Sequence, residues 1–361
     1  MVMAVLFLRL SHLKMKNENI VKNLTYFDSF DYLRVFFALS IIAWHTKVLG
    51  PTGLISSQFG FNFKDFIYGS IFLLGVPLFV QISLFLYLLN RENKSKYFIK
   101  RILDLFFLYF FWMAALILIF YKESGLKILT KTEFWLSGGA TPLYFLMVII
   151  ILTILLELFL LLEKTIDKKN FLIITLFALI VSIVANTNKV YLLDLFALGK
   201  TPFIMSHWSP INFLPYLFSS ILFLKIYKDG FLKQINIFKW AIISLVVFLT
   251  VAVLEYLYLP NALYLENGGM IIPTYSRLSL VLGTCLVFSV AISKDYRSSD
   301  FIKKISGLTM GIYILHIFVM NILAGVLGSR FETISGTPLY FVIVTLVSLL
   351  IANTLKEKRI I

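Results

Sequence analysis

Two residues that could do chemistry lie in one strongly apolar stretch of the sequence, residues 30–50: Arg34 and His45. His45 lies 11 positions after Arg34, and over 11 residues at about 100° each a helix turns to within about 20° of three full turns. If the stretch is helical, both side chains point the same way, about 16 Å apart along the axis. Because a guanidinium and an imidazole are costly in lipid, we expect both to face a protein interior or a wet cavity. The pair is typical of a tunnel in which an anion binds at one end and a proton is transferred at the other.

The composition indicates that these residues belong to a membrane protein. Of all residues, 60% are apolar and 14% are charged, and the mean hydropathy is +0.90. Soluble domains contain about 45–50% apolar and about 25% charged residues. No long polar segment could form a second domain. The sequence therefore predicts an N-terminal arm at 1–27, one transmembrane domain at 28–355 and a short tail at 356–361.

Hydropathy over a window of about twenty residues predicts an all-α fold with about ten transmembrane helices. The segment 191–199 is a short apolar piece that we expect to be re-entrant or interfacial. The predicted spans lie near residues 32–49, 66–89, 102–121, 142–162, 171–187, 211–227, 238–259, 274–292, 307–327 and 337–354.

Lysine and arginine are concentrated in alternate connections between these spans. Cytoplasmic connections carry an excess of positive residues, so the pattern predicts that both termini are cytoplasmic. The same bias explains the net charge of +14 without a nucleic-acid partner. We expect membrane lipids around the spans and a multi-pass location in the cytoplasmic membrane of a bacterium.

Four places in the sequence carry a resemblance to a known family. Arg34 and His45 form an Arg-x10-His pattern in the first span. The others are GVPLFVQISLFLYLL (75–89), FIKRILDLFFLYFFW (98–112) and SGLTMGIYILH (306–316). Together they resemble the membrane-bound acyltransferase family 3, whose members transfer acyl groups from coenzyme A to extracytoplasmic sugars and other acceptors. The likeness covers about residues 28–350.

The sequence also departs from the family pattern. Ser83-Leu84 replaces a Ser-Gly step, and Asp104 stands where a second basic residue is usual. TPLYFLMV (141–148) is similar to the fourth-span His-Leu-Trp-Phe-Leu motif, but Pro142 and Tyr144 replace the histidine and the tryptophan. Thr309 stands where a serine is usual, and no proline follows His316.

The resemblance implies an acyl-CoA donor, most simply acetyl-CoA, arriving from the cytoplasm, and no tightly bound cofactor. The acceptor would be a hydroxyl of a cell-surface or lipid-linked glycan. His45 would be the base, because an alcohol is a weak nucleophile at neutral pH. Arg34, Lys100 and Arg101 would bind the phosphates of coenzyme A, although the last two are also simple positive-inside anchors.

Several further residues keep two interpretations each. Glu255 could orient the imidazole of His45 or bind the acceptor, or it could serve helix packing. His316 is either an interior histidine or a site residue. His207 is expected to be a solvated loop histidine, with contact to a sugar beside Trp208 as the alternative.

The remaining patterns exclude some chemistry and leave one alternative function. No metal-like spacing of His and Glu and no phosphate-binding glycine loop is visible. Cys285, the single cysteine, is expected to pack in the core. Glu157 and Asp104 are expected to pair with nearby basic residues. A transporter or flippase of a lipid-linked saccharide remains the alternative, although no internal duplication is visible.

Overall fold

The computed structural model describes residues 27–49, 63–91, 96–121, 126–196, 202–258, 274–294, 296–328 and 334–357. Within these ranges the regular structure is entirely helical. A helix falls on every predicted span: α3 (Ser29–His45), α5 (Gly75–Arg91), α6 (Tyr97–Phe120), α8 (Tyr144–Leu160), α9 (Lys168–Thr187), α12 (Leu214–Lys228), α13 (Ile237–Tyr258), α15 (Leu278–Ser293), α17 (Thr309–Leu327) and α19 (Pro338–Glu357).

The described helices are those of a polytopic membrane protein. Among them, 8 are long and apolar enough to cross a membrane. The first of these, Ile67–Arg91, runs through a π-helical turn η1 (Ile67–Ile71) and a short turn η2 (Phe72–Leu74) into α5. α15, with 16 residues, and α3, with 17 residues, are shorter. The fold is therefore the predicted all-α membrane fold.

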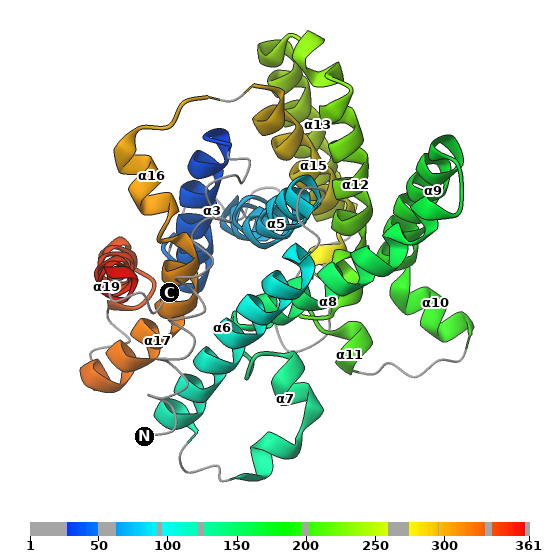
Figure 1. Ribbon diagram of the computed structural model, residues 1–361. Helices are drawn as coiled ribbons and strands as arrows, with labels where there is room; N and C mark the ends of the chain where they lie inside the picture. Colours follow the sequence, from blue (N-terminus) through cyan, green and yellow to red (C-terminus); the bar gives the residue numbers. More distant parts are fainter. Residues whose placement is uncertain are drawn as a thin grey trace.

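Helix α5 lies at the centre of the bundle (Figure 1). It contacts α3, α6, α8, α12 and α15. In its most apolar window 72% of the residues are buried, against 17% in α13 and 22% in α9. The outer helices thus expose apolar faces, which a surrounding bilayer would cover.

The close approach of α3 to α5 depends on Gly75. A Cβ atom at this position would lie 2.8 Å from Cγ1 of Ile41 and 3.1 Å from the carbonyl oxygen of Phe37. The absence of a side chain therefore lets the helix that carries Arg34 and His45 pack directly on α5.

The first turn of α3 is fixed to the segment around α16 (Asp300–Ser306). The Ser29 hydroxyl donates a hydrogen bond to the carbonyl of Lys294, with an O···O distance of 2.9 Å. The carboxylate of Asp31 is fully buried and accepts hydrogen bonds from the hydroxyls of Ser298 and Ser306, at 2.8 and 2.6 Å. These bonds set the orientation of the face on which Arg34 lies.

Short helices fill the connections. They include α4 (Phe63–Phe66), α7 (Thr132–Leu136), α10 (Lys189–Leu195), α11 (Pro202–Met205), and the 3-10 turns η3 (Leu126–Thr130), η4 (Leu162–Lys164), η5 (Pro210–Phe213), η6 (Phe231–Gln234) and η8 (Thr274–Ser276). Helix α10 covers the start of the segment 191–199 and, with 7 residues, is too short to span a bilayer. The predicted N-terminal arm lies outside the described residues except for Phe27.

Candidate active site

Two cavities lie beside α3, one near each end of the helix. The larger, of about 260 Å³, is lined by Arg34 and Arg101 among others. The smaller, of about 80 Å³, is lined by His45 and Tyr144 among others. Tyr313 of α17 lines both cavities. The shared helical face predicted for Arg34 and His45 thus opens onto two cavities that meet at one tyrosine.

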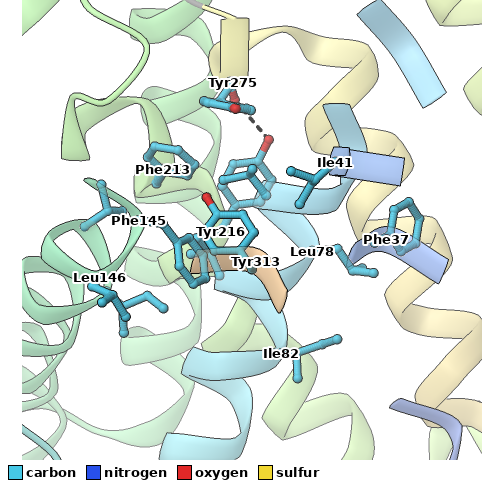
Figure 2. Close-up of a cluster of buried hydrophobic side chains, with 14 of the residues drawn as sticks. Phe37, Ile41, Leu78, Ile82, Phe145, Leu146, Phe213, Tyr216, Tyr275 and Tyr313 are labelled. Atoms are coloured by element: carbon cyan, nitrogen blue, oxygen red, sulfur yellow. Dashed lines mark hydrogen bonds between the residues drawn. The ribbon is translucent and has the colours of Figure 1, made fainter. Parts of the chain in front are cut away.

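An aromatic partition separates the two cavities. Figure 2 shows Phe145, Tyr216 and Tyr313 lying together, with Tyr275 towards one end of the cluster and Ile82 towards the other. Ile82 lines the larger cavity and Tyr275 the smaller one. The rings of Phe145 and Tyr313 are in contact, with centroids 5.3 Å apart. At Tyr313, which lines both cavities, the partition is one side chain thick.

The larger cavity presents two guanidinium groups. Nη1 of Arg34 lies 3.8 Å from the Asp31 carboxylate, and 26% of its side chain is exposed. Nη2 of Arg101 donates hydrogen bonds to the carbonyl and the hydroxyl of Ser83, at 3.1 and 2.6 Å. Nε of Arg101 is buried without a hydrogen-bond partner among the described residues. Two planar, permanently charged donors suit a phosphate group.

The smaller cavity contains His45 at the last residue of α3. His316 of α17 packs against it, with ring centroids 5.0 Å apart. His316 is fully buried and does not line either cavity. Neither of its ring nitrogens has a hydrogen-bond partner within the described ranges. The structure therefore places His316 behind His45, on the side away from the cavity lining.

A third histidine, His207, lines the same cavity from the connection between α11 and η5. Its ring stands perpendicular to Tyr144, with centroids 5.2 Å apart. The Tyr144 hydroxyl donates to the Tyr275 hydroxyl at 2.9 Å. His207 is exposed, so it lies at the mouth of the cavity. The sequence predicts a solvated loop histidine, but no pattern in it indicates that this connection lines the same cavity as His45.

A tight left-handed turn also contributes to the lining of the smaller cavity. Gly138, Gly139 and Ala140 have φ angles of 60°, 64° and 58°. A Cβ atom at Gly138 would lie 2.3 Å from the amide nitrogen of Tyr144. The turn places Ala140, Thr141 and Pro142 along the cavity, and Ala140 is exposed at its mouth. Left-handed non-glycine residues are uncommon and often mark functional sites.

A protein-family model covers most of the chain. A family model described as an acyltransferase domain matches residues 27–353. The chain belongs to acyltransferase family 3. No curated protein and no solved structure matches it. The match extends from the start of α3 to the last helix, so both cavities lie within the family domain.

Two further basic residues of this acyltransferase, Lys100 and Arg91, do not line the larger cavity. Lys100 is half-buried on α6 and does not line the cavity. Arg91 donates from Nε and Nη2 to the Glu157 carboxylate at 2.7 and 3.0 Å, and the Tyr87 hydroxyl also donates to it. Glu157 thus pairs with a nearby basic residue, as predicted, and Asp104 is exposed.

Glu255 of the acyltransferase lies in a separate polar cluster. It lines neither cavity, and its carboxylate binds Nε of Arg277 at 3.3 Å and the amide of Ser279 at 3.0 Å. Nη1 of Arg277 also donates to the carbonyl of Gly69 at 2.5 Å. The described contacts therefore join Glu255 to α15 and η1 and do not bring it to His45.

The described residues of the acyltransferase contain no group of three or more His, Cys, Asp or Glu side chains that could hold a metal ion. Cys285, on α15, is a free thiol of intermediate exposure. What the two cavities offer is therefore the chemistry of guanidinium, imidazole and hydroxyl groups.

Proposed function

We propose that this acyltransferase moves an acyl group, most simply acetyl, from acyl-CoA to a hydroxyl of a cell-surface or lipid-linked glycan. The observation that carries the proposal is the pair of cavities that share Tyr313, one with two guanidinium groups and one with His45. An anionic donor and a hydroxyl acceptor can occupy them together, and a shift of the rings between them would bring the thioester to the acceptor oxygen.

The donor would bind in the larger cavity. Arg34 and Arg101 would hold phosphates of coenzyme A, and Lys100 would add positive charge nearby on α6. A pantetheine arm is on the order of 15–20 Å long, comparable with the separation of about 16 Å between Arg34 and His45 along the helix axis. The apolar lining at Phe79, Ile82 and Ile149 suits the arm's methylene groups. The thioester would then reach the partition at Tyr313.

The acceptor hydroxyl would enter the smaller cavity and meet His45. His45 takes the hydroxyl proton as the acceptor oxygen attacks the thioester carbonyl carbon. The new C–O bond forms, the C–S bond breaks, and the proton passes to the leaving sulfur to give free coenzyme A. His316, packed against His45, would fix the position of that imidazole. No cofactor beyond the two substrates is required.

Orientation gives the reaction its direction. With both termini in the cytoplasm of a bacterium, the Arg34 end of α3 would face the cytoplasm, where coenzyme A is made. The His45 end would face outward, towards the glycan. Membrane lipids would cover the exposed apolar faces of α9 and α13, and neither substrate would have to cross the membrane.

Radiolabelled acetyl-CoA tests the proposal. Purified protein in detergent is incubated with the labelled donor and with candidate glycans, and both labelled glycan and free thiol are measured. We expect labelled glycan to form, and the free thiol to equal the sum of labelled glycan and labelled acetate released by hydrolysis. Absence of both, with protein that retains its folded melting transition, would overturn the proposal.

A further inference from the structure

The smaller cavity combines polar groups with aromatic rings. His207 and Ala140 are exposed there, on two different connections. Trp44, Phe72 and Tyr275 lie among the lining residues. Aromatic faces beside hydrogen-bonding groups suit a ligand that has both C–H faces and hydroxyls, as a sugar ring does.

The size of the cavity limits how much of the acceptor can enter. Its volume is about 80 Å³, roughly half of the about 150 Å³ of an engineered protein cavity that binds one benzene ring. The space therefore takes the reacting hydroxyl and its carbon, but not a whole pyranose ring. The rest of the ring must stay at the mouth, where His207 lies.

The imidazole of His207 is free to bind a ligand. Within the described ranges, its only ring contact is the perpendicular packing on Tyr144, and no hydrogen bond to its ring nitrogens is formed. Asn212 donates to the carbonyl of His207 at 3.3 Å and to the carbonyl of Ser206 at 2.8 Å, which fixes the backbone of this connection. The loop is thus held in place while the side chain keeps its donor and acceptor unused.

We propose that His207 is an acceptor-binding residue that holds a second hydroxyl of the sugar, next to the hydroxyl that meets His45. This rests on the function proposed above and narrows the acceptor class. The acceptor is a sugar with neighbouring hydroxyls, not a simple alcohol. His45 performs the proton transfer, and His207 selects which hydroxyl is presented.

The test measures how label from acetyl-CoA divides between a sugar and water. Full-length wild type, His207→Ala, His207→Gln and the neighbouring control Ser206→Ala are purified in detergent and checked for equal melting temperatures. Each is assayed with methyl β-D-glucopyranoside, methyl β-D-galactopyranoside or 1-propanol. A neutral hydrogen bond contributes about 0.5–1.5 kcal/mol, so its loss changes KM by up to about tenfold.

For His207→Ala we expect a glycoside KM about two- to tenfold higher than in the wild type, and a sugar-to-water ratio lower by the same factor. His207→Gln should recover part of this loss, and Ser206→Ala should keep the wild-type ratio. An unchanged ratio in His207→Ala, or an equal loss with 1-propanol, would overturn the role of His207. If the wild type releases no thiol with any acceptor or with water, the proposed function itself fails.

Discussion

At the scale of single residues, the end of α3 is where proton transfer is assigned. His45→Ala removes the imidazole while α3 keeps its contacts with α5 and α17. A positioned general base contributes about 10²–10⁴-fold to a rate, so we expect transfer from acetyl-CoA to fall by at least about a hundredfold. The measurement is labelled ester formed per minute by equal amounts of membrane-inserted protein. Near-normal turnover would remove His45 from the mechanism.

Arg34 is assigned to donor binding, so its substitution should act on affinity. Arg34→Lys keeps the charge but loses the planar fork that binds phosphate through two hydrogen bonds. A charge-assisted hydrogen bond contributes about 1.5–3 kcal/mol, which corresponds to an affinity loss of about tenfold to a hundredfold. Calorimetry with acetyl-CoA in detergent measures it. Lys239→Ala is the control, since Lys239 is an exposed cation at the start of α13.

Wild-type affinity in both Arg34→Lys and Arg34→Ala would exclude Arg34 from donor binding. His45→Ala offers the complementary comparison in the same titration. It should bind acetyl-CoA nearly as the wild type does, because His45 lines only the smaller cavity.

How far the site could be predicted from sequence depended on whether its residues share one helix. The spacing of Arg34 and His45 was enough to place them on one face. His207 lies in a connection far along the chain, and no periodicity links it to His45. The contact between His45 and His316 likewise depends on the packing of α3 against α17. Glu255 has a suitable chemical type, but Arg277 binds it.

At the scale of elements, the first turn of α3 is held by an ion pair that should respond to acid. Asp28 accepts from the Lys303 ammonium at 3.1 Å and from the Ser298 amide at 3.1 Å. Burial raises the pKa of Asp28, but these hydrogen bonds and the charges of Lys303 and Arg297 outweigh it, so the pKa is lowered. The folded state therefore binds this proton less readily than the unfolded state.

Asp28 therefore contributes fully to the free energy of unfolding above its unfolded-state pKa of about 3.9. This contribution is lost as the pH falls through its lowered folded-state pKa. We expect Asp28→Asn to reduce the fall in melting temperature between about pH 5 and the acid limit. Scanning fluorimetry in detergent over this range provides the measurement. Asp229→Asn breaks an exposed ion pair with Lys225. In this control variant the melting temperature should fall with pH as it does in the wild type.

The helices themselves followed from hydropathy, because long apolar runs leave no alternative in lipid. Features that depend on packing could not be predicted from hydropathy. The π-helical turn η1 next to Arg277, and the left-handed turn at Gly138 to Ala140, arise where the backbone meets other elements. Sequence patterns record periodicity, and these turns have none.

At the scale of the whole molecule, orientation is the property on which the proposed direction of transfer depends. The charge pattern predicts that Lys168, at the start of α9, faces the cytoplasm and that Lys131, before α7, faces outward. Both are exposed. In a Cys285→Ala background, which is free of cysteine, Lys131→Cys should react with a membrane-impermeant maleimide in intact cells. Lys168→Cys should react only after permeabilisation. The reverse pattern would invert the assigned topology.

The single layer of rings at Tyr313 also bears on permeability. Two cavities that approach each other from opposite ends of α3 come close to forming a pore, and the rings of Phe145 and Tyr313 stand between them. The thioester end of the proposed donor would pass such a layer when the rings shift slightly, whereas a hydrated ion would have to shed its water there. The same side chains that let an acyl group pass would then keep the membrane sealed to protons and salt.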